Sequence, residues 1–393
     1  MICDWMFLTA SIPWPDAIRL GTLIHVILFF AVALHCLINP RDPRSTIVWL
    51  FAVWGFPFFG ALLYAAFGIS RTPVKAWKKA SSEQNFAAAR SEREGETQPL
   101  AYWRSLLAAH IGQPDSAQTF NRVLDRITPD HPLLGGNAVE LLLDGTETYP
   151  ALLEAIAQAK HHIHLLYYII GCDALAHEIL DACAERARAG IKVRILFDEF
   201  GSAKASLSRM FRRYRNVPNM RIVGFTQVNI LKQRIQINLR NHRKIAVVDG
   251  VVSFTGGINL HDGHLPSNGK LAIRDYHFRI RGPLVNELQY TFLSDWYFMT
   301  DENPEELLSE AYFGCCTAVG NISARIVNSG PSSPGHSLED LFFNALSEAQ
   351  QKIVVVTPYL VLPPTLIQAM RMTAMRGVSV RLIVPANNNH RLV

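Results

Sequence analysis

The sequence predicts an amino-terminal transmembrane helical hairpin followed by an α/β fold in which helices flank a mixed sheet. Three observations predict it: two uncharged apolar runs near the start, alternating helix and strand patterns after residue 125, and an α/β unit that occurs twice. The chain has 393 residues, enough for two or three domains, and a mean hydropathy of +0.12, which is high for a water-soluble enzyme. Its 49% apolar content excludes a disordered chain, and its six cysteines lack the spacing of a disulfide framework.

The two apolar runs, residues 20–38 and 47–67, contain 19 and 21 residues and no charge. A membrane-spanning helix needs about 20 such residues, so both runs are expected to cross a membrane. A cleaved signal peptide is one alternative, but the first run is too long and Asp4 and Asp16 precede it. Two buried core helices are the other alternative, although such helices seldom lack all charge over this length.

Basic residues predict the orientation of the hairpin. Four of them follow the second run, with no acid before Glu83: Arg71, Lys75, Lys78 and Lys79. The turn between the runs has two arginines beside Asp42. The flank richer in basic residues faces the cytosol, which places the large C-terminal part there.

The elements after residue 125 follow from periodicity and turn signals. They are a helix at 149–160, a strand at 162–170, a helix at 174–189, strands at 191–197, 244–248, 251–255 and 276–280, and a helix from Pro283 to residue 296. Asp249-Gly250 between two short strands indicates a hairpin turn, and Gly190 is a good helix stop.

One α/β unit occurs twice. Residues 155–163 align with 345–353 at an offset of 190, and residues 190–196 align with 377–383 at an offset of 187. A duplicated half is the simplest account, and chance similarity of two helix–strand units is the alternative. The predicted organisation is a hairpin at 1–70, a juxtamembrane linker at 71–124, a first half at 125–320 and a partial second half at 321–393.

The sharpest chemical signal has the form H-x-K-x4-D, with His242, Lys244 and Asp249. Histidine and lysine one residue apart on a strand point to the same face and can reach one ligand. Histidine can attack phosphorus or transfer a proton near neutral pH, and lysine can neutralise a phosphoryl oxygen. For H-x-K alone, a surface pair on a strand is the alternative. Asp249 is at the hairpin turn and is expected to fix the backbone.

Residues after this motif extend the candidate site. Thr255-Gly-Gly-Ile-Asn259 places two glycines where a backbone must approach closely, followed by an amide able to bind phosphate. Asp275, at the start of a predicted strand, is a candidate to accept the Nδ1 proton of His242 and fix its tautomer.

With these residues the sequence resembles the phospholipase D superfamily and, within it, the bacterial cardiolipin synthases. The matching motif residues are His242, Lys244, Asp249, Gly256, Gly257 and Asn259. The amino-terminal runs and the segments around Asp144, Tyr168, Asp198 and Asp275 are also similar, so the resemblance covers essentially the whole chain.

The resemblance implies a two-step exchange of phosphodiesters. One histidine forms a phosphohistidine, and a second protonates the departing alcohol and then activates the incoming one. His242 belongs to this pair as nucleophile or as acid, Asp249 completes the catalytic motif, and Lys244 and Asn259 hold the phosphate. No metal or other cofactor is implied, because lysine, asparagine and backbone dipoles supply the electrostatic stabilisation.

The second half departs from the family pattern. Family members carry a second H-x-K-x4-D there, and none is present before the last residue, Val393. Since His242 follows Gly190 by 52 residues, we expect a truncated sequence that lacks about 90 residues, with the second motif about 35 residues past Val393.

Charge supports an anionic partner. The chain has a formal charge of +5, and between Gly201 and Val248 it has 11 lysines or arginines and no acid. A solvated face is the alternative, but beside a phosphate motif and a membrane anchor we favour attraction to anionic lipid. His161, His162 and His164 are expected to pack rather than bind metal, because no ligand of suitable spacing accompanies them.

The leading expectation is a membrane-bound phosphatidyltransferase that makes cardiolipin from two phosphatidylglycerols and releases glycerol. Two alternatives stay open: a phospholipase D-type phosphodiesterase with water as acceptor, and an inactive truncated form that binds lipid. The expected partners are phosphatidylglycerol, the membrane and a second copy of the chain, and two membrane spans argue against nucleic acid. The resemblance implies a multi-pass protein of the bacterial inner (plasma) membrane with its catalytic part in the cytoplasm.

Overall fold

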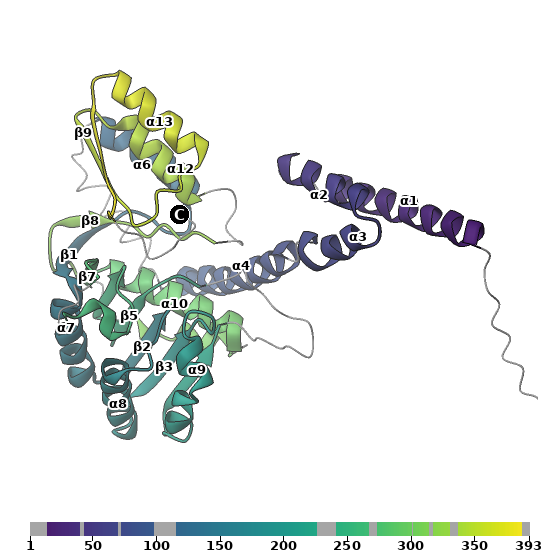
Figure 1. Cartoon of the computed structure of the whole chain (residues 1–393). Coiled ribbons are helices and arrows are strands. Elements are labelled where there is room, and N and C mark those ends of the chain that lie inside the picture. The colour runs from purple at the N-terminus through teal and green to yellow at the C-terminus, as the bar shows by residue number, and fades with distance from the viewer. Residues whose placement is uncertain are drawn as a thin grey trace, which may run out of the picture. The chain divides into compact units, whose positions relative to one another are not determined.

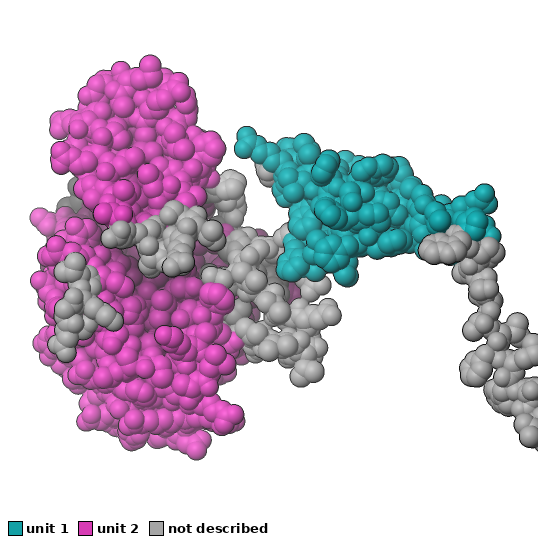
Figure 2. All heavy atoms as spheres, viewed as in Figure 1, with its two compact units in different colours: residues 1–75 teal, residues 76–393 magenta. Residues whose placement is uncertain are grey.

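The computed structural model describes residues 14–39, 43–69, 72–97, 115–225, 241–266, 273–300, 302–313, 317–330 and 337–386 (Figure 1). The chain forms two compact units, residues 1–75 and residues 76–393 (Figure 2). Each unit is described separately below.

The first unit is helical. Its elements are α1 (Trp14–Ile38), α2 (Pro43–Gly55), α3 (Phe59–Leu63) and a π-helical turn (Tyr64–Gly68). Among the described residues, one helix is long and apolar enough to cross a membrane, at Ile18–Ile38. Val32 and Cys36 of α1 pack against Val53 of α2 and against Tyr64. The first apolar run therefore forms the expected helix.

The second apolar run differs from the single spanning helix expected for residues 47–67. Helix α2 ends at Gly55, and Phe58 has a φ of 62°. Pro57 accounts for the break, because proline lacks a backbone N–H and disfavours a helical conformation in the residue before it. With 13 residues, α2 is about 20 Å long, short of the ~30 Å hydrocarbon core of a membrane. A second membrane crossing stays a prediction.

The second unit is built on an eight-stranded mixed sheet in the order β4-β3-β2-β5-β6-β7-β1-β8. The strands are β1 (Leu134–Leu143), β2 (His162–Tyr167), β3 (Lys192–Phe197), β4 (Met220–Gly224), β5 (Ile245–Val248), β6 (Val252–Gly256), β7 (Tyr276–Arg281) and β8 (Ile322–Ala324). The ladder β2-β3-β4 is parallel, and the other neighbours are antiparallel. Val248 pairs with Val252, which confirms the hairpin predicted around Asp249-Gly250.

Helices cover both faces of this sheet. The helices in this part of the chain are α4 (Thr72–Thr97), α6 (Asp115–Ile127), α7 (Asp144–Gln158), α8 (Ala174–Arg188), α9 (Ala203–Leu207), α10 (Leu284–Thr300) and α11 (Pro304–Leu307), with 3₁₀ turns at Met210–Tyr214, Asp262–His264 and Glu310–Tyr312. Helices α7 and α8 pack on one face and α10 packs on the other (Figure 1). Successive β2 residues alternate between the two cores, Leu165 in the first and Leu166 in the second. The α/β prediction is confirmed.

Part of the segment expected to be a juxtamembrane linker contributes to the second unit. Phe86 of α4 is fully buried in the core beside α10. On the same helix, Lys79 and Arg90 form ion pairs with Asp295 and Glu287 of α10. One buried aromatic residue in a polar helix leaves no apolar periodicity, so the sequence pattern does not reveal this packing.

The repeated unit has the same strand register in both copies. The second copy consists of α12 (Ser337–Glu348), β9 (Lys352–Val356), α13 (Pro364–Met375) and β10 (Ser379–Ile383). Ile163 pairs with Val193 in the β2–β3 ladder, and Ile353 pairs with Val380 in the parallel β9–β10 ladder. These pairs correspond under the offsets of 190 and 187 found in the sequence. The shared register agrees with the repeat found in the sequence, and a duplicated half stays a prediction.

Candidate active site

His242 and Lys244 lie on one face of the extended segment that leads into β5. The ammonium nitrogen of Lys244 is 3.4 Å from His242 Nδ1 and donates a 2.6 Å hydrogen bond to the His242 carbonyl oxygen. Lys244 is buried, whereas His242 is exposed. The juxtaposition expected from their spacing is present, with a buried cation beside an accessible imidazole.

Burial sets the charge state of Lys244. It lowers the pKa of the ammonium to about 8, against the opposing attraction of the Asp275 carboxylate. The ammonium form still predominates at neutral pH, and an approaching phosphate oxygen would stabilise it further. Because little water surrounds this cation, its attraction for an anion is weakly screened.

Tyr168, which directly follows β2, supports the His242 imidazole. The two ring centroids are 3.9 Å apart with an interplanar angle of 30°, and Lys244 Nζ is 5.4 Å from the tyrosine ring. Gly201 allows the chain to approach Tyr168, since a Cβ there would lie 2.3 Å from the Tyr168 carbonyl oxygen. The resemblance includes Tyr168 in a strand, but the sequence does not predict its stacking on His242.

The glycine pair at the end of β6 brings two further side chains close to the site. A Cβ on Gly256 would lie 2.8 Å from His277 Nδ1, and a Cβ on Gly257 would lie 2.1 Å from Asp275 Oδ1. The close approach expected at these glycines is therefore present. Asp275 Oδ1 accepts a hydrogen bond from the backbone N–H of Tyr276. The expected hydrogen bond from His242 Nδ1 to Asp275 stays a prediction.

His277 on β7 is a buried histidine that the sequence reasoning missed. Its two ring nitrogens have no hydrogen-bond partner among the described residues. Burial, followed by His264 and Lys244, lowers the pKa of His277 to about 3. The imidazole is therefore neutral at physiological pH and does not repel the nearby Lys244 ammonium. A polar residue at an inward position of a short strand was the only available signal.

Asn259 is oriented by the backbone beside Tyr168. Its Oδ1 accepts a 3.0 Å hydrogen bond from the backbone N–H of Ile169, and the residue is 9% exposed. Its Nδ2 group makes no hydrogen bond within the described part of the chain. The amide N–H groups are therefore the end that can donate to an anion, as the predicted phosphate-binding role requires.

Asp249 fixes the backbone at the far end of β5 from Lys244. Its carboxylate accepts hydrogen bonds from the backbone N–H groups of Lys160, His161 and His162, at 2.7, 2.8 and 2.9 Å. Asp249 itself has a φ of 56°, a conformation that aspartate tolerates better than most residues. These contacts are those of the backbone-fixing role predicted for it. A direct part in catalysis has no support in this placement.

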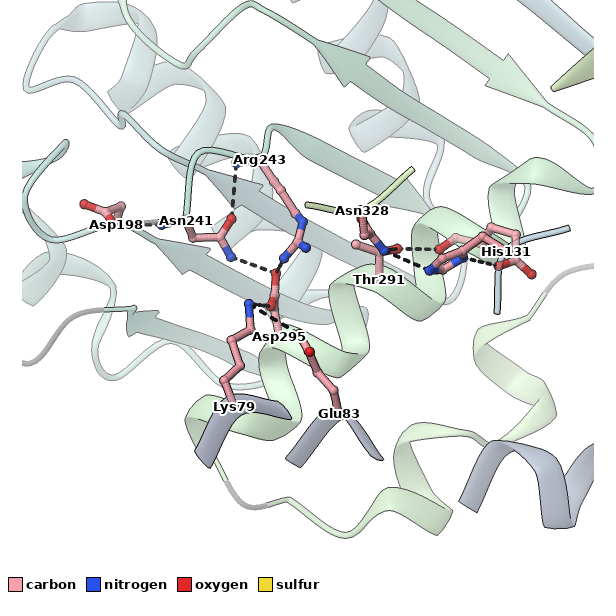
Figure 3. Close-up of polar contacts among 10 residues, drawn as sticks. Lys79, Glu83, His131, Asp198, Asn241, Arg243, Thr291, Asp295 and Asn328 are labelled. Carbon is pink, nitrogen blue, oxygen red and sulfur yellow. Dashed lines mark hydrogen bonds and ion pairs between the residues drawn. The ribbon is translucent and has the colours of Figure 1, made fainter. Parts of the chain in front are cut away.

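A buried carboxylate anchors the residues on both sides of His242. Asp295 of α10 accepts hydrogen bonds from Asn241 Nδ2 at 2.7 Å and from Arg243 Nη1 at 2.5 Å, and it pairs with Lys79 at 3.0 Å (Figure 3). Burial would raise the pKa of Asp295, but Arg243 and Lys79 overcome it and lower the pKa to about 2. The sequence reasoning also missed this anchor, because it joins segments far apart in the chain.

A cavity of about 500 Å³ adjoins the site. His242, Lys244, Gly256 and residues 325–330 contribute to its lining. The described residues of the lining include four lysines or arginines and no aspartate or glutamate. Its volume falls within the range of about 300–1,000 Å³ typical of small-molecule sites. Its size and the cations of its lining suit a phosphate-bearing headgroup.

Comparison with known proteins decides the family. The family described as "Cardiolipin synthase, PLD-like domain" matches residues 152–296 and 342–393, and the one described as "Phospholipase_D-nuclease N-terminal" matches residues 27–68. The cardiolipin synthase of Geobacillus kaustophilus is 33% identical over 365 residues, which are 92% of this chain and 70% of that protein. The chain belongs to the cardiolipin synthase family.

Two further cardiolipin synthases agree with this assignment. Cardiolipin synthase A of Pseudomonas putida is 31% identical over 94% of this chain and 74% of its own length, and the cardiolipin synthase of Alkalihalophilus pseudofirmus is 31% identical over 99% and 73%. Among solved structures, the phosphatidylserine synthase of Haemophilus influenzae is 19% identical with a TM-score of 0.47, covering 67% of this chain and 65% of that one. Membership in the cardiolipin synthase family makes the chain a phosphatidyltransferase enzyme with a phospholipase D-like domain.

Two of the three neighbouring histidines of β2 and its entrance are part of the core. His162 and His164 are buried, and the His164 ring stacks on Phe292 with a centroid distance of 4.6 Å. Burial lowers the pKa of His162 to about 3 and that of His164 well below its usual value. The packing role predicted for these two residues is confirmed, while His161 is exposed.

Proposed function

We propose that this protein joins two phosphatidylglycerols into cardiolipin and releases glycerol. The observation that carries the proposal is the exposed His242 imidazole, 3.4 Å from the buried Lys244 ammonium in a cationic cavity. An ammonium group that neutralises phosphate oxygens next to an imidazole that can reach phosphorus is what phosphoryl exchange requires. The lipid character of the substrate is supported by the family and by the apolar helix of the first unit.

The proposed reaction has two steps and regenerates the protein. In the first, a histidine nitrogen attacks the phosphorus of one phosphatidylglycerol. The bond from phosphorus to the oxygen of the headgroup glycerol breaks, and a proton goes to that departing glycerol. In the second, the terminal hydroxyl of the other phosphatidylglycerol attacks the phosphohistidine, loses its proton and frees the histidine. His242 serves in this pair as nucleophile or as acid. Lys244 and the Asn259 amide stabilise the charge on the phosphate oxygens.

We also propose a bacterial inner-membrane location with the second unit in the cytoplasm. The helix at Ile18–Ile38 supports membrane association. The basic residues that follow the second apolar run support the cytoplasmic orientation.

An exposed basic surface of the second unit supports contact with anionic lipid. We call residues 200–215 the basic ridge; its exposed cations are Lys204, Arg209, Arg212, Arg213 and Arg215. Leu207 and Phe200 on the ridge are 83% and 54% exposed. Apolar side chains among cations are typical of surfaces that lie on an anionic membrane. Lys232, Arg234 and Arg240 of the same basic stretch lie outside the described residues.

The product formed from labelled phosphatidylglycerol tests the proposal. The full chain is incorporated into vesicles that contain phosphatidylglycerol labelled in its phosphate and its headgroup. We expect labelled cardiolipin and free glycerol, and neither product from the Lys244→Met control. Phosphatidic acid in place of cardiolipin would overturn the proposal in favour of a phospholipase with water as acceptor. Normal lipid binding without any product would overturn it in favour of an inactive lipid-binding form.

A further inference from the structure

One buried lysine of α4 belongs to the surroundings of His242. Lys79 is 7% exposed and lines the same cavity as His242. Its ammonium nitrogen lies 3.0 Å from Asp295 Oδ1, 3.5 Å from Glu83 Oε1 and 5.4 Å from the centroid of the Phe225 ring. The two-step reaction assigns no role to this cation, and the sequence placed it in a linker.

Asp295 connects this lysine to both chain neighbours of His242 (Figure 3). The two carboxylate oxygens are divided between the partners. Oδ1 pairs with Lys79, whereas Oδ2 accepts hydrogen bonds from Asn241 Nδ2 at 2.7 Å and from Arg243 Nη1 at 2.5 Å. The backbone N–H of Arg243 also donates to Asn241 Oδ1 at 3.1 Å. The placement of His242 between these two residues therefore depends on how the Asp295 carboxylate is oriented.

Lys79 fixes that orientation. It provides the one contact that Asp295 Oδ1 makes within the described part of the chain, and the Asp295 side chain is 1% exposed. A buried carboxylate oxygen that loses its partner is unfavourable, because water does not replace the partner. A guanidinium group can serve both oxygens of one carboxylate, so the carboxylate would turn further toward Arg243. This rearrangement would move Arg243 and, with it, the adjoining His242.

A second ion pair joins the same two helices without this connection. Arg90 Nη2 of α4 lies 2.7 Å from Glu287 Oε1 of α10, and the Glu287 side chain is 2% exposed. Burial would raise the pKa of Glu287 as it would that of Asp295, but nearby cations lower both to about 2. The other oxygen of Glu287 pairs with His131 Nδ1 at 2.6 Å. The two pairs are alike in helices, burial and charge, and they differ in their link to the segment around His242.

We propose that Lys79 is a positioning residue for His242, acting through the Asp295 carboxylate, and that α4 is therefore part of the active site. Lys79 takes no part in the bond exchange. Its effect on turnover rests on the proposed transfer, whereas its effect on the placement of the His242 imidazole does not. Lys79→Met is expected to lower kcat for phosphatidylglycerol about tenfold and to leave KM within about threefold. A rise in KM with kcat unchanged would make Lys79 a substrate-binding residue and overturn the proposal.

Chemical modification of His242 tests the positioning without turnover. The full chain in detergent is treated with diethyl pyrocarbonate, and mass spectrometry compares the rate at His242 with the rate at the exposed His161. We expect Lys79→Met to change the ratio of these rates about threefold or more. Arg90→Met is the matched control, which should lower Tm to a similar extent and leave the ratio and kcat unchanged. An equal change of the ratio in both variants, or in neither, would overturn the proposal.

A double variant shows whether Lys79 acts through Asp295. Residues that act as a unit have non-additive effects, so Lys79→Met combined with Asp295→Asn should lower kcat about tenfold, no more than Asp295→Asn alone. Losses that multiply to about a hundredfold would overturn the proposal. The double variant also keeps the test decisive if Lys79→Met alone does not fold, because no carboxylate is then left without its cation.

A conservative variant separates the charge contact from the lysine itself. Lys79→Arg keeps a cation that can donate to Asp295 Oδ1, and it should retain kcat within about threefold of the wild-type value. A loss as large as that of Lys79→Met would contradict a role through the ion pair. If the wild-type chain transfers nothing, the proposed reaction fails, while the modification rates of His242 in the single and double variants still decide the role of Lys79.

Discussion

Asp249 is expected to stabilise the fold and to leave the chemistry of the folded protein almost unchanged. Its carboxylate accepts three backbone hydrogen bonds of 2.7, 2.8 and 2.9 Å. Hydrogen bonds to a charged group contribute about 1.5–3 kcal/mol each, and the two exposed N–H groups would recover part of this from water. Alanine would also be strained at a φ of 56°, by about 1 kcal/mol. Asp249→Ala should therefore lower the free energy of unfolding by about 4 kcal/mol.

Thermal unfolding of the full chain in detergent measures this effect. At about 2 °C per kcal/mol for a large domain, Asp249→Ala should lower Tm by about 8 °C. Asp249→Asn keeps one acceptor oxygen and tolerates the backbone conformation, so we expect about half that shift. Transfer rates measured well below either Tm should stay within about threefold of the wild-type rate. An unchanged Tm combined with a collapsed rate would refute this reasoning and make Asp249 a participant in the reaction.

Three further predictions follow from the site and its surroundings. The pKa of Lys244 is lowered from 10.5 to about 8, so the transfer rate should fall as pH rises through about 8. The free energy of unfolding should rise between pH 8 and pH 10.5, because only the unfolded chain keeps the proton there. Lys244→Arg should remove the fall from the pH–rate profile. Asp295→Asn should lower kcat about tenfold and change the rate at which diethyl pyrocarbonate modifies His242, read by mass spectrometry. Glu287→Gln is the control, because it alters an equally buried ion pair of α10. It should lower Tm about as much as Asp295→Asn but leave the rate of His242 modification unchanged. If both variants change the rate of His242 modification equally, the anchoring role of Asp295 is contradicted. Leu207→Asp should slow transfer in vesicles but not with detergent-dispersed lipid. If the variant slows transfer equally in vesicles and in detergent, or in neither, insertion of the basic ridge into the membrane is excluded.

Features encoded by local patterns were predictable from the sequence. Alternation and turn chemistry gave the β5–β6 hairpin, because Asp249-Gly250 favours the tight turn between short apolar strands. The one-residue spacing of His242 and Lys244 fixed their common face. The repeat was visible as two alignments, and the register of β9 and β10 agrees with them. Each of these depends on residues close in sequence or on direct comparison of two segments.

Features that depend on contacts between distant segments were not predictable. Asp295 lies more than fifty residues after His242 in an unremarkable helical position, and its role exists only because α10 crosses the sheet at that point. Tyr168 and His277 likewise reach the site only because neighbouring strands bring them beside it. The break in the second apolar run was missed for another reason: hydropathy counts apolar residues and ignores the effect of Pro57 on the helix.

The central claim is that the imidazole of residue 242 takes part in the exchange of a lipid phosphodiester. The most direct test measures conversion of labelled phosphatidylglycerol to cardiolipin in vesicles by the wild-type chain and by His242→Gln. The account predicts a loss on the order of 10³-fold or more in the variant, with lipid binding unchanged and only a small change in Tm, because His242 is exposed and its ring contact is with Tyr168 at the edge of the site. Undiminished cardiolipin formation by His242→Gln would contradict it.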